Sequence, residues 1–398
     1  MNVNLPAHRH DPRKNLLVLP SADPQAVFWD REPVVCGFRR LTHRPAGQSR
    51  AIEVPISSSP VVVSGAGVVL GASDGTVTFY DRTLGKEYWS QRLDSPIYAS
   101  LVADARRRRV IVIATSGLAA CFDLRGRPLW SARVEDPVYA TPLVLPNADR
   151  LVVAAFNSRC TGLNLETGAR VFDHRLPEPW HAAHGGSAAH RDAYASPVAT
   201  GEGNAVIACA EHVLCLTPDG EELWRTEVGH SIKASPVGLH DRHEILVAPV
   251  DGTCLFLDSR TGQVLAAIGL DAKVTGSPAA SGGLVAVGTT DGTVTALDAR
   301  SHGIVWRSAQ GAPREYTSVT TLPSGDFVAT AGNGNIVCLA REDGKFLWET
   351  SQVLGLPDHR PAMDITPVAG VDGSMYGASY SGTAYHFRFR PRDKESFG

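Results

Sequence analysis

The sequence predicts an all-β fold, a closed eight-bladed β-propeller built from four-stranded antiparallel blades. Three observations lead to it: a serine or threonine start that recurs eight times, tight-turn pairs inside the repeats, and an aromatic residue near the end of most repeats. Helical periodicity does not extend over any useful length. A repeat of about forty residues is typical of a propeller blade.

Each repeat begins at a serine or threonine that usually precedes proline. The eight starts are Ser59, Ser100, Thr141, Ser196, Ser235, Ser277, Ser318 and Thr366. Successive starts are 41, 41, 55, 39, 42, 41 and 48 residues apart, so most units have one size and two carry insertions. A propeller blade of four short strands needs about this length.

Turn signals divide each unit into strands. Asp-Gly or Asn-Gly pairs, which tolerate the positive φ of a two-residue hairpin, occur at 74–75, 251–252, 291–292 and 333–334. A second reversal at a glycine is followed, three or four residues later, by Trp89, Trp130, Phe172, Trp224, Trp306 and Trp348, whereas Ala266 breaks the pattern. Radial stacking buries the faces that no single unit can bury alone.

The chain ends indicate how the ring closes. The segment Ser49 to Val54 lines up with the outer-strand segments of the first units, and the last unit runs out after Phe387 without an outer strand of its own. We therefore expect segment 49–54 to complete the final blade. The predicted domains are an N-terminal arm packing on the ring at 1–47, with partner binding as its alternative role, the propeller at 48–390 and a C-terminal tail at 391–398.

Two segments, Tyr80 to Trp89 and Leu257 to Gly262, resemble the A-x-D-x-x-T-G-x-x-x-W repeat of the pyrroloquinoline-quinone (PQQ) dependent alcohol dehydrogenases. The resemblance covers about residues 49 to 390. It implies a PQQ-like propeller in which the repeat tryptophans dock one blade on the next. Those enzymes also use adjacent cysteines, a calcium site and an export signal. This chain shows neither the cysteine pair nor the signal, so we expect no bound quinone and no other cofactor.

Two other kinds of protein contain a similar repeat. The bacterial outer-membrane assembly lipoprotein shares the eight-bladed repeat, but it needs a lipoprotein signal with a cysteine near its start, and Cys36 has no such context. Some acyl-activating enzymes carry such a propeller as a recognition platform beside an adenylation domain. Nothing in this sequence resembles that domain.

Composition narrows the function classes. Charges of both signs nearly cancel to a formal net charge of −3, which argues against a nucleic-acid binder. The run of arginines at 106–109 is expected in a solvated hairpin turn. No secretory signal or membrane-spanning run is recognised, so we expect a soluble, cytoplasmic protein with no membrane contact. The cysteines in strand-like runs, expected to be small buried hydrophobes without disulfides or metal, are Cys121, Cys160, Cys215, Cys254 and Cys338.

The candidate site lies where the innermost strands begin, because alternate side chains there face the channel. The residues two positions before each start are Ser57, Tyr98, Tyr139, Tyr194, Lys233, Thr275, Tyr316 and Asp364, and those two positions earlier include Asp192, Lys273 and Arg314. Convergent polar groups with aromatic walls are typical of small-molecule sites. The alternative is that a wet channel tolerates polar residues without any function.

The insertion between the third and fourth units, 177–190, is expected to lie over one face of the ring. His181 and His184 within it have a possible metal-ligand spacing, but the surrounding glycines and alanines favour solvent or ligand contact, and we expect no metal. Trp180 is interpreted as a lid anchor or a stacking group.

Together these residues predict a propeller that binds a small polar molecule or a protein partner at the channel mouth. The alternative is a cofactor-independent enzyme, of lyase, cyclase or hydrolase type, acting on a metabolite in a biosynthetic pathway. Lys233, Tyr316 and Asp364 are then the candidate acid and base groups. Both alternatives stay open at this point, as does the oligomeric state.

Overall fold

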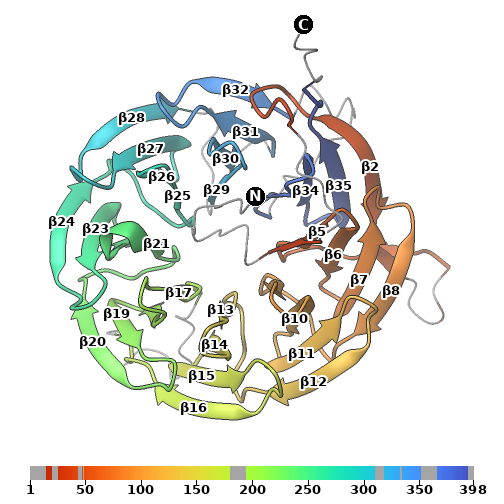
Figure 1. Ribbon diagram of the computed structural model, residues 1–398, viewed down its shortest axis with the longest axis horizontal. Helices are drawn as coiled ribbons and strands as arrows, with labels where there is room; N and C mark the ends of the chain where they lie inside the picture. Colours follow the sequence, from red (N-terminus) through yellow and green to blue (C-terminus); the bar gives the residue numbers. More distant parts are fainter. Residues whose placement is uncertain are drawn as a thin grey trace, which may run out of the picture.

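The computed structural model describes residues 15–19, 26–43, 47, 49–179, 194–309, 318–331, 334–350 and 365–392. Within these ranges the chain forms β-strands and a 3-10 helix, η1 (His240–Arg242). Eight sheets stand radially around a central channel (Figure 1). The predicted all-β, eight-bladed propeller is confirmed.

Blades 1 to 4 follow one another in chain order, each running from the innermost to the outermost strand. Blade 1 contains β5 (Val61–Ser64), β6 (Gly67–Gly71), β7 (Thr76–Asp81) and β8 (Glu87–Arg92). Blade 2 contains β9 (Val102–Asp104), β10 (Arg109–Ile113), β11 (Leu118–Asp123) and β12 (Pro128–Arg133). Blade 3 contains β13 (Leu143–Leu145), β14 (Arg150–Ala155), β15 (Arg159–Asn164) and β16 (Arg170–Arg175). Blade 4 contains β17 (Val198–Ala199), β18 (Ala205–Cys209), β19 (His212–Leu216) and β20 (Glu222–Glu227).

Blades 5 to 7 repeat the same order. Blade 5 contains β21 (Val237–Leu239), β22 (Glu244–Val247), β23 (Thr253–Asp258) and β24 (Val264–Gly269). Blade 6 contains β25 (Ala279–Ser281), β26 (Leu284–Gly288), β27 (Thr293–Asp298) and β28 (Ile304–Ala309). Blade 7 contains β29 (Val319–Thr321), β30 (Phe327–Thr330), β31 (Ile336–Leu339) and β32 (Phe346–Glu349).

Blade 8 joins the two ends of the chain. Its inner strands are β33 (Val368–Ala369), β34 (Ser374–Ala378) and β35 (Thr383–Arg388), and its outermost strand is β2 (Val34–Arg40), which pairs antiparallel with β35. Closure by an N-terminal strand is therefore confirmed, but our assignment of that strand to 49–54 was wrong. Residues 52–53 form β4 (Ile52–Glu53), which pairs only with β3 (Thr42–His43). The ring thus includes part of the segment predicted to be an arm at 1–47.

A second N-terminal strand enters the ring from the channel side. β1 (Leu16–Val18) pairs in parallel with β5 and extends blade 1 by a fifth strand. Leu16 and Leu17 are buried in the contacts that this strand makes.

The repeat tryptophans of four blades dock onto the next blade, as the resemblance implies. In four blades the indole Nε1 donates a hydrogen bond to a backbone carbonyl 35 residues further along, from Trp89, Trp130, Trp224 and Trp306 at 2.9 to 3.1 Å. The indole ring also covers the turn glycine of the next blade. At Gly262, whose φ is 73°, a Cβ atom would lie 2.4 Å from Trp224 Cε3, so only glycine fits.

Histidine takes over this role where the pattern breaks at Ala266. His302, in the turn of blade 6 at a φ of 56°, places its ring 4.4 Å from the ring of Phe256 in blade 5. Its Nε2 lies 2.9 Å from an oxygen of the buried carboxylate of Glu244. The contact between blades 5 and 6 is therefore made by a side chain of the following blade.

The arginine run at 106–109 does more than occupy a solvated turn, which corrects our expectation. Arg107 lies within 3.2 Å of the buried Asp104 and makes ion pairs with Asp149 and Glu166 of blade 3. Arg109 contacts the same Glu166 at 2.9 Å. The run forms an ion-pair network that links blade 2 to blade 3.

Cysteine burial agrees with the prediction. The five cysteines of the strand-like runs are all buried and free, whereas Cys36 is exposed. Burial raises the pKa of the Cys121, Cys215 and Cys254 thiols to about 12, so these side chains stay neutral and pack as small hydrophobes.

The seam between blades 8 and 1 contains a buried histidine. His386 of β35 is 2% exposed, stacks on Tyr376 and places Nε2 3.2 Å from Ser374 Oγ. Across the seam, the Tyr376 hydroxyl donates to the carbonyl of Arg82, and Arg82 pairs with Asp372. Burial, with the nearby positive charge of Arg82, lowers the pKa of His386 to about 4, although Asp372 and Asp81 oppose the shift.

Acidification is expected to weaken this seam. An unfolded histidine binds a proton near pH 6.5 and folded His386 only near pH 4, so the unfolded state binds more protons between these values. Stability is therefore lost as the pH falls through this window, by about 2 kcal/mol between pH 7 and pH 5. Urea unfolding at both pH values measures the loss, which should shrink in a His386→Gln variant. An equal pH dependence in variant and parent would contradict the assignment.

Candidate functional site

The predicted channel-mouth residues surround one cavity of about 380 Å³, at the end of the ring where the innermost strands begin. All eight repeat starts line it, together with the described ring positions. Its lining residues are Ser57, Ser59, Tyr98, Ser100, Tyr139, Thr141, Tyr194, Ser196, Lys233, Ser235, Thr275, Ser277, Ser318, Ile365 and Thr366. The ring positions lie in the segments that lead into the innermost strands, not within the strands themselves.

Hydrogen bonds join the repeat starts of blades 1 to 7 around the neck of this cavity. In six of the eight repeats the backbone N–H of the start donates to the side-chain oxygen of the start in the next blade. Such bonds, of 2.9 to 3.3 Å, join Ser59 to Ser100, Ser100 to Thr141, Thr141 to Ser196, Ser196 to Ser235, Ser235 to Ser277 and Ser277 to Ser318. The recurring hydroxyl residues therefore link the inner edges of blades 1 to 7, a structural role that the repeat pattern alone did not indicate.

These hydroxyl groups can still donate hydrogen bonds into the channel. A hydroxyl can accept and donate at once, and accepting a backbone N–H leaves its own hydrogen as a donor. The neck is thus lined by a circle of hydroxyl groups, and Lys233 adds an exposed side chain at its rim. Such a mouth can bind groups that accept hydrogen bonds.

Tyrosines from successive blades form a continuous aromatic arc on one side of the mouth. The ring of Tyr98 lies 5.5 Å from that of Tyr139, which lies 4.7 Å from Phe156, which in turn lies 4.9 Å from Tyr194. The two ends of the arc, Tyr98 and Tyr194, are 40% and 45% exposed. Phe156, absent from our prediction, directly follows β14 and fills the gap between the tyrosines of blades 3 and 4.

Several predicted site residues fall elsewhere. Lys273 is exposed and is not among the residues that line the cavity. The remaining predicted residues lie outside the described ranges: Trp180, His181, His184, Asp192, Arg314, Tyr316 and Asp364. Their assignment to the site stays a prediction.

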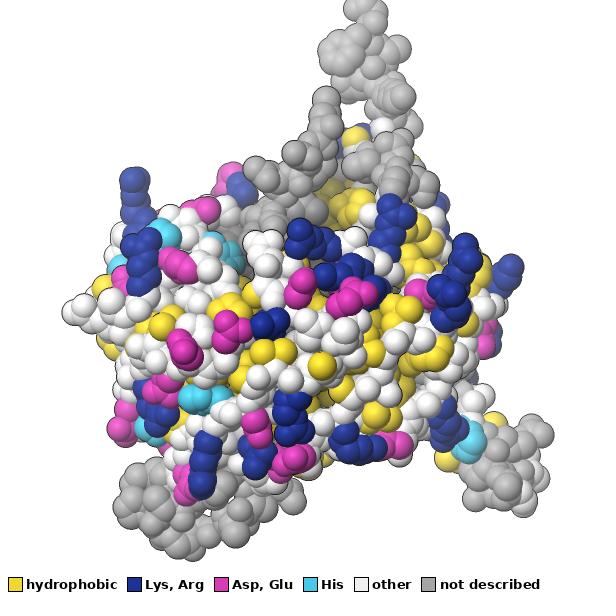
Figure 2. Space-filling model, turned by 60° about the horizontal axis from the view of Figure 1, so that its bottom comes forward, with side chains coloured by type: hydrophobic (Ala, Val, Ile, Leu, Met, Phe, Trp, Pro, Cys, Tyr) yellow, Lys and Arg dark blue, Asp and Glu magenta, His cyan; other side chains and the backbone are white. Residues whose placement is uncertain are grey.

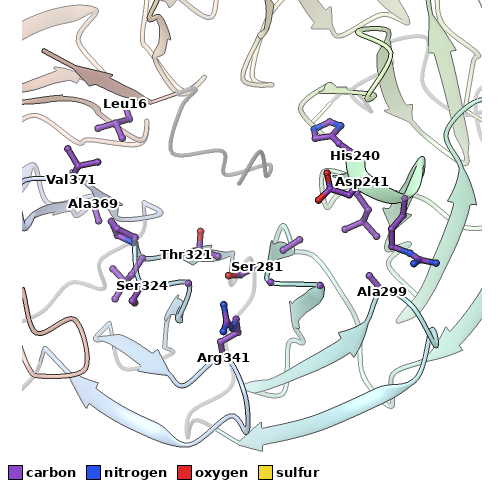
Figure 3. Close-up of a pocket in the computed structure, with 18 residues that line it drawn as sticks. Leu16, His240, Asp241, Ser281, Ala299, Thr321, Ser324, Arg341, Ala369 and Val371 are labelled. Carbon is purple, nitrogen blue, oxygen red and sulfur yellow. The ribbon is translucent and has the colours of Figure 1, made fainter. Parts of the chain in front are cut away.

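A larger cavity, of about 450 Å³, opens where the innermost strands end, at the opposite mouth (Figure 3). Sequence reasoning missed it, because its walls come from β1, η1 and the turns of blades 6 to 8. It is lined by Leu16, Leu239, His240, Asp241, Arg242, Ala280, Ser281, Gly282, Gly283, Ala299, Thr321, Leu322, Pro323, Ser324, Gly325, Arg341, Ala369 and Val371.

The outer surface, metal binding and membrane-spanning helices are the remaining features to consider for a site. On the side of the ring shown in Figure 2, acidic and basic side chains are interspersed with hydrophobic ones. Among the described residues, no three His, Cys, Asp or Glu side chains are grouped so that they could hold a metal ion. The described part of the chain also contains no helix with the length and apolar character needed to cross a membrane.

Comparison with known protein families shows which family the chain belongs to. A family model described as "Outer membrane protein assembly factor BamB" matches residues 26–215 and 209–388, nearly the whole ring. The chain belongs to this BamB-like family of PQQ propellers. The suspected PQQ-like repeat is thereby confirmed, and the assembly-factor relative that we had set aside on the absence of a signal is the relevant one.

Curated relatives of this BamB-family chain are all described as outer membrane protein assembly factor BamB. Those of Nitrosomonas eutropha, Yersinia pestis and Burkholderia pseudomallei are 28%, 25% and 25% identical over 160, 179 and 216 residues. The matches cover 40%, 41% and 50% of this chain. They span only 37%, 45% and 53% of the relatives' own lengths, about half or less.

Solved structures agree with the fold of this BamB-family chain. The crystal structure of BamB from Moraxella catarrhalis aligns with a TM-score of 0.65 at 16% identity, covering 90% of this chain and 100% of that one. The computationally designed Ika8 protein aligns with a TM-score of 0.63, also at 16% identity, over 95% of this chain and 100% of its own. At this identity the likeness concerns the fold alone.

Proposed function

We propose that this chain is a non-catalytic scaffold that recognises a protein partner at the channel mouth lined by the tyrosine arc. The observation that carries the proposal is the run of four rings from Tyr98 to Tyr194, whose two ends are exposed. Tyrosine offers a large, rigid contact area with a polar tip, which is why it is enriched in protein interfaces. The relatives named as assembly factors support a partner that is itself a protein.

The size of the mouth defines how such a partner would engage. A cavity of about 380 Å³ admits a loop or a terminal segment but no folded domain. The segment's apolar side chains would stack on the tyrosines, while its backbone carbonyls would accept hydrogen bonds from the hydroxyl circle. Lys233 would favour an acidic residue at the rim. By analogy with its relatives, we propose that the partner belongs to a protein-assembly machinery.

A small polar molecule is the second candidate occupant. The volume of the cavity, about 380 Å³, favours this occupant, because small-molecule sites span roughly 300 to 1,000 Å³ and combine aromatic walls with a few polar groups. The enzyme alternative rests on Lys233 with Tyr316 and Asp364. Two of these three residues lie outside the described ranges.

The proposed protein partner could be met in the cytoplasm or at the outer membrane, and the location of the chain in the cell distinguishes these two versions of the proposal. The sequence alone favours a cytoplasmic protein, whereas the relatives are named for assembly at the outer membrane. Fractionation of the native organism's cells, with immunodetection of the chain, decides between them. Recovery in the membrane fraction would overturn the cytoplasmic version.

A photo-crosslinking amino acid tests the docking position directly. Placed at Tyr98 it should trap a protein partner in cells, and placed at Leu223, on the outer strand β20, it should not trap the same protein. With the purified partner, a Tyr98→Ala, Tyr194→Ala variant should bind at least tenfold more weakly, because buried aromatic anchors contribute about 2 kcal/mol or more each. Unchanged affinity in that variant would overturn the proposal. A small-molecule function would instead give saturable metabolite binding without a trapped protein.

A further inference from the structure

The cavity at the opposite mouth has an asymmetric lining that indicates its ligand. Leucine, valine, alanine and proline supply eight of its eighteen lining residues, with Leu16, Ala369 and Val371 at one end (Figure 3). The Asp and Arg residues that line it are Asp241, Arg242 and Arg341, and Arg341 is drawn below Ser281 with its guanidinium directed toward that serine. This lining, with aliphatic residues and arginine, differs from that of the tyrosine-lined mouth on the other side of the ring.

Arg341 is held in place by two tight turns. A Cβ atom at Gly282 would lie 2.7 Å from Arg341 Nη1, and one at Gly325 would lie 3.0 Å from the same atom. Both glycines have positive φ, 55° and 93°, so the turns of blades 6 and 7 leave room for the guanidinium. Its backbone is fixed as well, because the N–H donates to Asp326 and the carbonyl accepts from Trp306.

The charge of Arg341 is little neutralised by the protein. Its guanidinium forms an ion pair with Glu342 at 3.5 Å, and that carboxylate side chain is 85% exposed. Arg242, which also lines the cavity, is by contrast paired at 2.9 Å with the buried Glu244. A guanidinium held beside apolar walls attracts a carboxylate, which its fork binds through two parallel hydrogen bonds.

We infer that this cavity binds the carboxylate group of an apolar organic acid, with Arg341 as its charge partner. Ser281 and Thr321, beside the guanidinium, can donate hydroxyl hydrogen bonds to the same group. Asp241, at the opposite end with His240, would repel a carboxylate and so orient the acid toward Arg341. The apolar body would then lie against the aliphatic wall. The acid could be a free small molecule or the C-terminus of a peptide.

Titration calorimetry on the full chain distinguishes these sources. The probes are 3-phenylpropionate and the peptide acetyl-Ala-Ala-Phe with a free carboxylate, each compared with its neutral amide. We expect at least one acid to bind at least tenfold more tightly than its amide, as a charge-assisted hydrogen bond requires. Binding of the free acid identifies a small-molecule site, and binding of the peptide acid alone identifies a chain terminus. Equal binding of acid and amide, or no binding of either acid, would overturn the inference.

Matched variants assign the effect to Arg341. Arg341→Gln should bring the acid's affinity down to that of its amide, while Arg341→Lys, which keeps the charge but loses the fork, should give an intermediate value. Arg225→Gln removes an arginine from β20, outside the cavity, and should leave binding unchanged. Since the Arg341 carbonyl that Trp306 uses is retained, the melting temperature should stay near that of the parent. Full acid binding by Arg341→Gln would show that the inference is wrong.

Discussion

Replacing Trp224 with alanine is expected to lower the free energy of unfolding by about 3 to 5 kcal/mol. The indole is 8% exposed, covers Gly262 of blade 5 and donates a 3.0 Å hydrogen bond to the carbonyl of Ser259. Its removal leaves a cavity between blades 4 and 5 and a buried carbonyl without its donor. Urea unfolding followed by circular dichroism measures the change.

The neighbouring residue provides the control for this experiment. Leu223 stands on the same strand, 50% exposed, and its replacement by alanine should cost no more than about 0.5 kcal/mol. If the two variants unfold at the same urea concentration, the tryptophan is not the docking residue that its contacts indicate. Partner binding by Trp224→Ala, measured where the variant is still folded, should match the parent.

Local repetition made most of the fold predictable. The Ser/Thr starts, the Asp-Gly turns and the tryptophans each recur at one structural position, so their spacing indicates blade number and strand order without any knowledge of distances. The same register placed Tyr98, Tyr139, Tyr194 and Lys233 at one mouth, and they line one cavity there. The repeat does not indicate which of these residues contact a ligand, because the ligand is not part of the chain.

Features that depend on contacts between distant segments were missed. The outer strand of the last blade comes from 34–40, where the exposed and half-buried residues of β2 alternate. This stretch falls within the predicted arm at 1–47, because segment 49–54 fits the repeat register better. The Arg341 cavity joins β1 to turns more than two hundred residues away. No sequence period relates those segments.

Deleting residues 1–40 is expected to abolish cooperative unfolding of the ring. This removes β2 and leaves the whole length of β35 as an open sheet edge, which exposes backbone groups to pairing with other chains. It also removes Trp29, whose carbonyl accepts the 2.9 Å hydrogen bond from the docking Trp348 of blade 7. We expect loss of several kcal/mol of stability and concentration-dependent aggregation, measured by thermal melts and light scattering. A chain beginning at Asn15 retains β1, Trp29 and β2 and should melt like the full chain. If the chain beginning at Leu41 instead melts cooperatively at the parent's temperature, β2 does not lock the ring.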